Sequence, residues 1–336
     1  MALPGNGTEN RLRARVVGLG AAVGERVLTN FDLEKMVDTS DEWIVSRTGI
    51  RERRVAAPET ATSDLATAAA REALAQAGIP AQRLDLVVVA TVTPDMSFPA
   101  TACLVAERLG APQVAAFDLS SGCTGFLYGC AVATAMIQAG TAKYVLVAGG
   151  DVLSRITDWQ DRSTCVLFGD GVGAAVLAAE TGERGFLGFR LGSDATGGKH
   201  LYLPAGGSRL PASEETVAGR MHYIRMNGQE VFKFAVRAIE EATLALLGDL
   251  HLGPDDVDVF IPHQANLRIV DAAARRLGFP PEKVVVNLER YGNMSAGSVP
   301  VALYEAVRDG RVSPGDLLLM VAFGAGLSWA AAAYRW

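Results

Sequence analysis

The sequence predicts an α/β fold made of two similar halves. Continuous apolar runs, such as residues 86–90 and 144–148, are typical of strands that are buried on both faces of a sheet. Segments such as 67–78 and 232–247 have the apolar spacing of amphipathic helices, and they alternate with the strand-like runs. The order of these elements then repeats, which indicates a duplicated αβ unit.

The repeat is visible at corresponding turns of the two halves. The helix-ending segment 108–112 (RLGAP) corresponds to segment 276–280 (RLGFP), and a strand follows each of them. These strands run into Gly122 and Gly292, which are 170 positions apart, and the next glycine turn repeats with the same offset. Two ordinary βαβ runs with coincidentally similar turns are the alternative explanation.

The duplication predicts the domain organisation. We expect an N-terminal half over residues 13–183 and a C-terminal half over residues 184–336. The first dozen residues are expected to be a disordered lead-in. In a duplicated αβ unit, equivalent loops lie near a pseudo-twofold axis. The loops at positions 123 and 293 should therefore approach each other from opposite halves.

The composition argues against several classes of protein. The chain has 336 residues, of which 49% are hydrophobic, enough for a large core. Its formal net charge of −6 argues against a general nucleic-acid-binding surface, which requires a basic face. No apolar run reaches the roughly 18 residues of a membrane span, and we identify no signal peptide. We therefore expect a cytoplasmic protein that binds neither membrane nor nucleic acid.

The cysteines do not form a structural pattern. Four cysteines in a chain of this length make no disulfide framework, and without a C-x-x-C pair structural zinc is not expected. Cys103 and Cys130 lie in helix-like segments and Cys165 in a strand-like run, so we interpret these three as small buried residues. We expect reduced thiols and no metal.

Cys123 has the sequence context of a nucleophile. It lies between a strand that ends near Leu119 and a helix-like segment over residues 124–138. The positive end of a helix dipole and its free backbone N–H groups favour a thiolate at this position. Gly122 and Gly125 leave room for a substrate to approach. Cys123 is thus the predicted nucleophile of an acyl-transfer reaction, and a small buried cysteine is the alternative.

A histidine and an asparagine lie at comparable turns. His263 directly follows the strand-like residues 259–262, at the carboxyl end of a buried strand, where α/β folds place their sites. The other histidines lie in polar or loop-like sequence. Asn293 lies in the loop 291–297, which is rich in small residues. A Cys, a His and an Asn at such turns of a duplicated fold form a specific catalytic pattern.

These residues and several longer motifs resemble the β-ketoacyl-acyl carrier protein (ACP) synthase III family. The resemblance extends from about Arg13 to Trp336. It implies a thiolase-like fold, in which the two duplicated halves form a five-layered αβαβα sandwich. It also implies an acyltransferase that initiates fatty-acid synthesis. The matching motifs are DTSDEWIV (38–45), RTGIR (47–51), FGDG (168–171), PHQANLR (262–268), GN (292–293) and AFG (322–324).

The resemblance implies a role for each residue of the pattern. Cys123 would accept the acyl group from acyl-CoA as a thioester. His263 and Asn293 would bind the thioester carbonyl of malonyl-ACP and stabilise the enolate that forms when CO₂ leaves. The enolate would attack the acyl group to give a 3-oxoacyl-ACP, without a metal or any other cofactor. The backbone N–H groups of Cys123 and Ala325 would hold the oxyanion, and Phe323 would favour loss of the carboxylate.

The resemblance also implies where coenzyme A binds. Trp43 and Arg162 match the family positions that sandwich the adenine, which agrees with the stacking of Trp and Arg planes on a purine. Thr39, Arg47 and Asn266 would line the same site. Core packing is the alternative role for Trp43, whose charged neighbours in the sequence favour a surface site.

A basic helix after His263 is the expected docking site for the acidic carrier protein. We predict this helix over residues 266–277, and basic side chains on an acidic chain favour an acidic partner. Positions 268 and 275 share one helix face. A solvated helix face without a partner is the alternative. The predicted carrier-protein contacts are Gln264, Ala265, Asn266, Leu267, Arg268, Arg275 and Arg276.

The chain departs from the commonest family pattern at several positions near the predicted site. Met294 follows the Asn where Thr is usual, Gly297 replaces Ala, and Ala325 replaces Gly. These changes remove no catalytic group, but they leave the preferred acyl group open. Phe98 matches a family residue that reaches across a homodimer interface into the neighbour's acyl pocket, and ordinary packing is its alternative role.

Several related enzymes share part of this pattern. A thiolase would need a second cysteine in the last glycine-rich turn, where residues 323–326 contain none, and a hydroxymethylglutaryl-CoA synthase would need a catalytic Glu. A type III polyketide synthase lacks the QANLR segment. The nearest rival is a starter-loading ketosynthase or acyltransferase of a polyketide or other secondary-metabolite pathway. A catalytically inactive scaffold subunit is the alternative from a different class.

Overall fold

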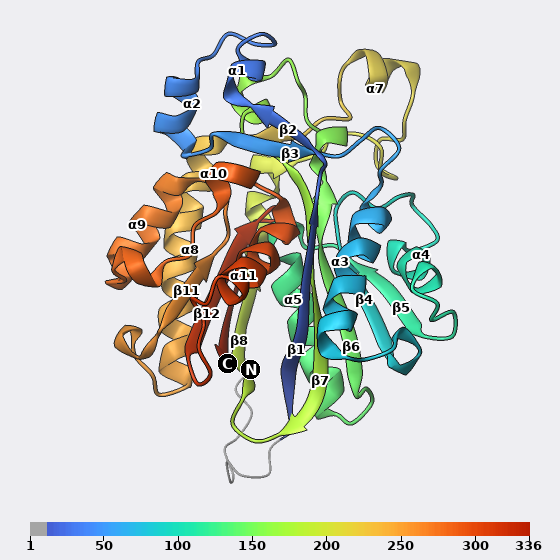
Figure 1. The fold of residues 1–336 in the computed structure, drawn as a ribbon. Coiled ribbons are helices and arrows are strands. Elements are labelled where there is room, and N and C mark those ends of the chain that lie inside the picture. Colours follow the sequence, from blue (N-terminus) through green and yellow to red (C-terminus); the bar gives the residue numbers. More distant parts are fainter. Residues whose placement is uncertain (1–11) are drawn as a thin grey trace.

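Two β-sheets with helices between and outside them make up the fold (Figure 1). The structure is a computed structural model that describes residues 12–336, so the expectation for the preceding residues lies outside the described part. The strands of the first sheet are β1 (Leu12–Val23), β4 (Leu86–Ala90), β5 (Ala115–Leu119), β6 (Tyr144–Val152) and β7 (Asp170–Thr181). Their order across the sheet is β1-β7-β6-β4-β5.

The second sheet repeats the topology of the first. Its strands are β8 (Gly185–Ser193), β11 (Val259–Pro262), β12 (Leu317–Gly324) and β13 (Ser328–Arg335), in the order β11-β12-β13-β8. In the first sheet β4 is parallel to β6, and β7 is antiparallel to both β6 and β1. In the second sheet β11 is parallel to β12, and β13 is antiparallel to both β12 and β8. The four strands therefore correspond one to one.

The counterpart of β5 in the second half is reduced to a bridge. Phe260 forms a parallel bridge with Val284, and the backbone N–H of Val285 donates to the Phe260 carbonyl (2.9 Å). The Val285 carbonyl accepts a hydrogen bond from the side-chain amide of Gln264 (3.0 Å). A side chain thus takes the place of a longer strand pairing at this edge.

The helices form three layers around the two sheets. The middle layer lies between the sheets and shares one apolar core with both, and the two outer layers cover the opposite sheet faces. This order of layers is the five-layered αβαβα sandwich that the resemblance implied. The helices are α5 (Gly125–Gln138) and α11 (Ser298–Arg308) in the middle, α3 (Thr62–Ala77) and α4 (Thr101–Arg108) over the first sheet, and α8 (Gly228–Asp249) and α9 (Leu267–Leu277) over the second.

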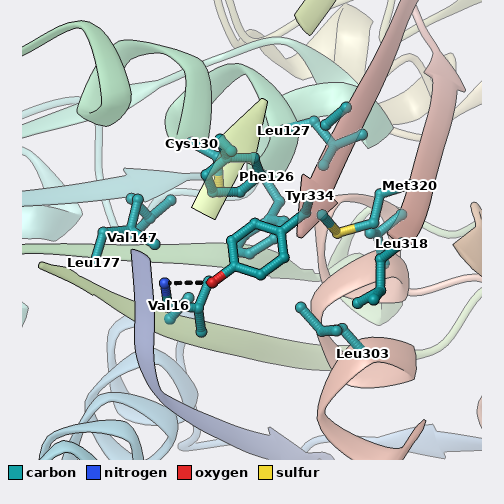
Figure 2. Packing of buried hydrophobic residues seen from close by; sticks show 14 of the residues in the cluster. Val16, Phe126, Leu127, Cys130, Val147, Leu177, Leu303, Leu318, Met320 and Tyr334 are labelled. Carbon is teal, nitrogen blue, oxygen red and sulfur yellow. Dashed lines mark hydrogen bonds between the residues drawn. The ribbon is translucent and has the colours of Figure 1, made fainter. Parts of the chain in front are cut away.

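Tyr334 lies in the core between the sheets and joins the two halves (Figure 2). Its ring meets the ring of Phe186 edge-on, with centroids 4.9 Å apart. Its hydroxyl accepts a hydrogen bond from the backbone N–H of Val16 on β1 (2.9 Å), so the buried oxygen has a partner. Burial raises the pKa of this phenol. The contact links the first strand of the chain to its last.

Short elements cover one end of the sandwich (Figure 1). β2 pairs antiparallel with β3, and β9 pairs antiparallel with β10. Among the described residues, no helix is both long and apolar enough to cross a bilayer. The short elements are β2 (Arg26–Thr29), α1 (Asn30–Leu33), α2 (Asp41–Thr48), β3 (Glu52–Val55), α6 (Arg162–Cys165), β9 (Leu201–Tyr202), α7 (Glu214–Ala218), β10 (Arg225–Met226) and α10 (Leu288–Tyr291).

Two predictions about individual cysteines were wrong. Cys103 is exposed on α4 rather than buried. Cys165 is buried as expected, but it ends helix α6 instead of lying in a strand. The side chain of Asp161 caps the start of this short helix by accepting from the backbone N–H of Ser163 (2.9 Å), which favours a helical turn over a strand at residues 162–165. Cys130 is buried in the central core.

Candidate active site

Cys123 lies where β5 turns into the central helix α5. It belongs to a short 3-10 helix, η3 (Gly122–Thr124), which leads directly into α5. The next residue, Thr124, is completely buried, and its hydroxyl lies 3.1 Å from that of Ser328 on β13. The nucleophile turn is therefore fixed against the second half of the molecule.

The turn between β12 and β13 lies directly against Cys123. A Cβ atom added to Gly324 would lie 2.7 Å from the backbone nitrogen of Cys123, which is closer than a side chain tolerates. A Cβ atom added to Gly122 would lie 3.1 Å from the backbone nitrogen of Ala325. Glycine at both positions permits this approach. The two backbone N–H groups expected to hold the oxyanion thus come from segments in contact.

His263 is buried at the carboxyl end of β11. Its backbone N–H donates to the Val321 carbonyl of the neighbouring strand β12 (2.7 Å). Its ring stands edge-on to Phe323, with ring centroids 5.2 Å apart, and Nδ1 has no hydrogen-bond partner within residues 12–336. Burial lowers the pKa of His263 to about 3. The imidazole is therefore neutral at physiological pH and offers one donor and one acceptor.

Asn293 is held from its backbone and from its side chain. Its N–H donates to the Leu167 carbonyl (2.8 Å), and its carbonyl accepts from the Gly169 N–H (3.0 Å). Its side-chain oxygen accepts from the backbone N–H of Ser295 (2.8 Å). This last contact fixes the orientation of the amide, so the NH₂ group is the end that can donate to a substrate.

Ser295 connects Asn293 to Cys123, a role that the sequence did not indicate. It begins the 3-10 helix η8 (Ser295–Gly297), and its backbone has a left-handed φ of 51°. Its side chain forms a hydrogen bond with Cys123 that lowers the pKa of the thiol. The small-residue loop 291–297 was the available signal, but no pattern within it distinguishes this serine.

Burial dominates the protonation of Cys123. Desolvation raises the pKa of the thiol to about 12, and the hydrogen bond with Ser295 acts in the opposite direction. The expected thiolate at the helix N-terminus is therefore not the resting form. The residue therefore rests as a thiol.

These contacts bring the three predicted catalytic residues into one site. The turn 323–325 contacts both Cys123 and the His263 ring. Ser295 links Cys123 to the Asn293 side chain. The nucleophile comes from the first half of the chain and the two other residues from the second half, as the duplication predicted.

A stacked Trp–Arg pair lies among the residues expected to bind coenzyme A. The Arg162 guanidinium lies 5.0 Å from the centroid of the Trp43 ring and donates to the Asp38 carbonyl (2.8 Å). The Thr39 hydroxyl is buried and has no hydrogen-bond partner within the described chain. Trp43 on α2 is half-buried, so it is part of the surface rather than of the central core.

Asn266 joins the predicted coenzyme A site to the predicted docking helix. Its side-chain amide donates to the Arg47 carbonyl at the end of α2 (3.0 Å). Its side-chain oxygen accepts from the backbone N–H of Arg268 (2.9 Å) and so caps α9. Helices α2 and α9 therefore meet immediately beside His263.

The structure separates the residues that were predicted to contact the carrier protein. Ala265, Asn266 and Leu267 are half-buried, whereas Arg268, Arg275 and Arg276 are exposed. Arg276 forms an ion pair with Glu240 on α8 (2.7 Å). Gln264 is completely buried, so its prediction as a surface contact was wrong. Its side-chain amide is not available to a partner protein, because it donates to the backbone carbonyls of Pro262 and Val285 in the interior.

Phe98 lies on an exposed loop between β4 and α4. Its side chain is 84% exposed, which is unusual for a large apolar residue of a folded chain. Phe98 contributes nothing to the core of this chain and points away from it.

No group of three or more His, Cys, Asp or Glu residues that could hold a metal ion occurs within residues 12–336.

The site combines a thiol from one half of a duplicated fold with two neutral polar groups from the other half. This combination in a five-layered αβαβα sandwich is that of a thiolase-fold condensing enzyme. The profile described as 3-oxoacyl-[acyl-carrier-protein (ACP)] synthase III matches residues 117–195, and that of its C-terminal part matches residues 247–336. The chain belongs to the β-ketoacyl-ACP synthase III family.

Relatives agree with this assignment over nearly the whole chain. The β-ketoacyl-[acyl-carrier-protein] synthase III of Desulfitobacterium hafniense is 60% identical over 321 residues, which are 96% of this chain and 97% of that protein. The crystal structure of the Thermus thermophilus enzyme is 51% identical with a TM-score of 0.90, covering 96% of this chain and 99% of that one. The priming β-ketosynthase of the R1128 polyketide pathway is 36% identical with a TM-score of 0.90, covering 99% and 98%.

Proposed function

We propose that the chain condenses an acyl-CoA starter with malonyl-ACP, with loss of CO₂, and that the 3-oxoacyl-ACP product initiates fatty-acid synthesis. The observation that carries this proposal is the pair of neutral donors formed by His263 and Asn293. The His263 ring is uncharged, and the Asn293 amide oxygen is already occupied by Ser295. Both residues can therefore donate to one carbonyl oxygen as negative charge develops on it.

In the first half-reaction, Cys123 is the acyl acceptor. Its sulfur attacks the thioester carbonyl of acyl-CoA, a new C–S bond forms, and coenzyme A leaves as a thiol after it takes up the cysteine proton. The tetrahedral oxyanion lies at the backbone N–H groups of Cys123 and Ala325, which the close approach of their two turns supports. No metal or redox cofactor takes part in this step.

In the second half-reaction, the bond between C2 and the carboxylate carbon of malonyl-ACP breaks. CO₂ leaves, and the bonding electrons form an enolate whose oxygen accepts hydrogen bonds from His263 and Asn293. The apolar Phe323 ring beside His263 disfavours a carboxylate and favours its loss. The enolate carbon then attacks the acyl carbonyl on Cys123, the C–S bond breaks, and the sulfur leaves as a thiolate that takes up a proton from solvent.

The two substrates fit different surfaces around the same site. The Trp43–Arg162 pair suits the adenine of coenzyme A, with Thr39, Arg47 and Asn266 beside it. Helix α9 presents Arg268 and Arg275 to solvent on an acidic chain, which suits an acidic carrier protein. A cytoplasmic location, as expected from the sequence, suits a reaction between these two soluble substrates.

Two copies of the chain would complete the acyl pocket. β5 is the edge strand of the first sheet, and its Phe117 side chain is 36% exposed. The exposed Phe98 loop follows the neighbouring strand β4. A homodimer that pairs along this edge would bury both phenylalanines and bring Phe98 of one copy toward the acyl pocket of the other.

Priming of a polyketide pathway is the second candidate, because the R1128 ketosynthase shares the fold and 36% of the aligned sequence. The higher identity of 60% to a β-ketoacyl-ACP synthase III favours initiation of fatty-acid synthesis. The departures from the family pattern at Met294, Gly297 and Ala325 lie close in sequence to the proposed site and remove no catalytic side chain, so they leave the preferred starter open.

Separate assays of the two half-reactions test the proposal. Mass spectrometry of the protein after incubation with a panel of acyl-CoAs measures loading of Cys123, and CO₂ release measures decarboxylation of malonyl-ACP. Cys123→Ala should abolish loading. His263→Ala and Asn293→Ala should load normally but decarboxylate roughly 10²- to 10³-fold more slowly, since each removes one donor to the enolate.

The exposed His251 provides a matched control. His251→Ala should leave both half-reactions unchanged. If the unmodified chain loads an acyl group but does not condense it with malonyl-ACP, it is a plain acyltransferase and the synthase proposal is wrong.

A further inference from the structure

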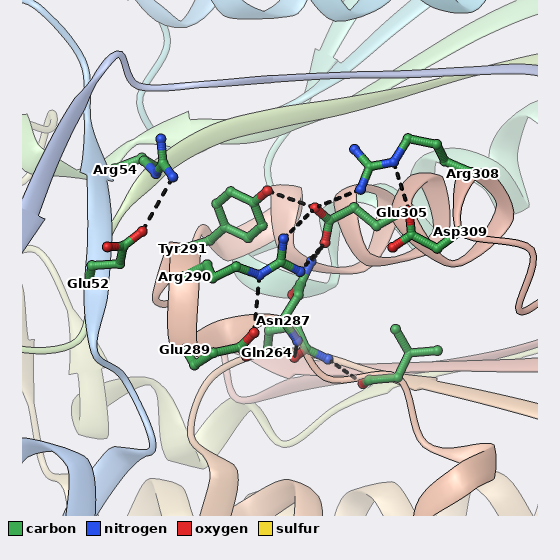
Figure 3. A network of polar contacts seen from close by, with 11 residues as sticks. Glu52, Arg54, Gln264, Asn287, Glu289, Arg290, Tyr291, Glu305, Arg308 and Asp309 are labelled. Carbon is green, nitrogen blue, oxygen red and sulfur yellow. Dashed lines mark hydrogen bonds and ion pairs between the residues drawn. The ribbon is translucent and has the colours of Figure 1, made fainter.

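A buried carboxylate behind the active site holds the segment that leads to Asn293. Glu305 lies on α11, and only 4% of the residue is exposed. Its oxygens accept hydrogen bonds from three side chains, Asn287, Arg290 and Tyr291 (Figure 3). These four residues are called the Glu305 network below. Every donor comes from the short segment that precedes Asn293.

The geometry of the network is specific. Arg290 donates to both oxygens of Glu305, at 3.1 and 2.9 Å. The Tyr291 hydroxyl donates to one oxygen (2.7 Å) and the Asn287 amide to the other (2.9 Å). A bidentate Arg–carboxylate pair constrains orientation more than a single hydrogen bond does. Because Asn287 precedes α10 and Tyr291 ends it, the network fixes this helix at both ends.

Helix α10 determines how the chain reaches Asn293. Gly292 alone separates Tyr291 from Asn293. On the far side, the Asn293 backbone is fixed to Leu167 and Gly169. The Glu305 network therefore supplies the near-side anchor of the loop whose side chain would donate to the substrate.

The same network reaches the His263 loop through Gln264. The backbone N–H of Asn287 donates to the side-chain oxygen of Gln264 (3.0 Å). The Gln264 amide nitrogen in turn donates to the carbonyls of Pro262 (2.7 Å) and Val285 (3.0 Å). Pro262 and Gln264 flank His263, so the buried amide fixes the backbone on both sides of this histidine. Both proposed enolate donors are thus tied to one carboxylate.

We propose that Glu305 is a positioning residue that holds His263 and Asn293 at the separation required by the enolate, which rests on the roles proposed above for these two residues. The hydrogen bonds of the network involve neither Cys123 nor its partner Ser295. Cys123 is held instead by η3 and the turn at Gly324. Loosening the network should therefore slow decarboxylation and spare priming.

Glu305→Gln tests this positioning role. The substitution keeps the size of the side chain but removes the charge that pairs with Arg290. We expect kcat for malonyl-ACP decarboxylation to fall about 10- to 100-fold, because small displacements of catalytic groups have effects of this size. The KM for malonyl-ACP and the rate of acyl loading from acyl-CoA should change less than about twofold, because the hydrogen bonds of the network involve neither Cys123 nor the exposed arginines of α9.

Tyr291→Phe is a milder variant that preserves charge and ring packing. It removes one hydrogen bond to Glu305, so the decarboxylation rate should fall roughly two- to tenfold. Arg308→Gln is the matched control, because exposed Arg308 approaches Glu305 at 3.7 Å from the surface. This control should leave both half-reactions unchanged. Thermal unfolding of each variant shows whether it is folded.

Equal slowing of loading and decarboxylation in Tyr291→Phe and Glu305→Gln would indicate a merely structural role and overturn the proposal. His263→Ala and Asn293→Ala, assayed in parallel, separate the possible failures. If these two variants decarboxylate at the normal rate, their proposed roles are wrong. If they lose decarboxylation while folded Glu305→Gln and Tyr291→Phe retain it, the roles stand and the positioning function of Glu305 is wrong.

Discussion

His263 and Asn293 are polar groups that the protein leaves partly unsatisfied. The Asn293 amide uses its oxygen on Ser295, and Nδ1 of His263 has no partner within the described chain. Unpaired polar atoms in a buried site have an energetic cost, and they occur where a substrate completes the hydrogen bonding. At the scale of single residues, these unpaired groups therefore support the proposed donation to a carbonyl oxygen that gains charge.

The pKa of His263 predicts the pH dependence of decarboxylation. Because burial lowers this pKa to about 3, the ring remains neutral as the pH falls from 8 to 5.5. The decarboxylation rate of Cys123→Ala, in which the thiol cannot contribute, should therefore be constant over this range. A decline with a midpoint near 6.5, the usual pKa of histidine, would contradict the neutral donor.

The same shift also makes folding dependent on pH. Between about pH 6.5 and 3 the unfolded chain takes up a proton at His263 and the folded chain does not. The contribution of His263 to stability is therefore lost progressively as the pH falls through this window. His263→Ala should show a smaller loss of thermal stability over the same range.

At the scale of elements, two helices from different halves meet beside His263. Asn266 caps α9 through its oxygen and binds the end of α2 through its amide. The predicted coenzyme A and carrier-protein surfaces therefore adjoin each other, although they lie far apart in sequence. Arg268, the first exposed basic residue of α9, lies above the Phe232 ring at 5.7 Å from its centroid.

Arg268→Glu tests the docking role of α9. Reversal of this exposed charge should raise the KM for malonyl-ACP about tenfold, because the acidic carrier would meet a repulsive group. Loading of Cys123 from acyl-CoA should remain nearly unchanged. Arg83→Glu, a charge reversal at an exposed site of the first half, is the control for the change in net charge. An equal loss in both half-reactions of Arg268→Glu would defeat the docking role.

At the scale of the whole molecule, the duplicated architecture brings the proposed catalytic turns together. Each half contributes one central helix, α5 or α11, and these helices share a core with both sheets. Cys123 precedes the first helix and Asn293 the second. The proposed catalytic residues thus come from both halves. At one edge of the first sheet, β5 carries the exposed Phe117.

The proposed dimer is tested by mass and by starter preference. Sedimentation should give about twice the chain mass of 35.3 kDa at micromolar concentration.

Phe98→Ala should remain dimeric and load longer acyl-CoAs about tenfold better relative to short ones, because a larger pocket favours additional methylenes. Leu244→Ala, an exposed apolar residue of α8, is the control. A monomer, or an unchanged starter preference, would contradict the role of Phe98.

Much of the fold and site could be predicted from the sequence, because the relevant signals are local. Buried strands such as 86–90 and helices such as 266–277 follow from short-range apolar patterns, and the observed β4 and α9 agree with them. Cys123, His263 and Asn293 lie at turns whose composition is visible within a few residues. The repeat then predicted that the turns at Cys123 and Asn293 approach each other from opposite halves.

The tertiary structure decided what depends on distant neighbours. From its sequence context, Gln264 was predicted to be a polar surface residue that contacts the carrier protein. In the structure its amide is buried against Val285 and Asn287. Ser295 is one small residue among several until its contact with Cys123 is known. For Cys123 itself, the sequence determined that a helix begins there. The protonation of its thiol was decided by burial between the two halves. Desolvation depends on everything packed around a group, not only on its neighbours in the chain.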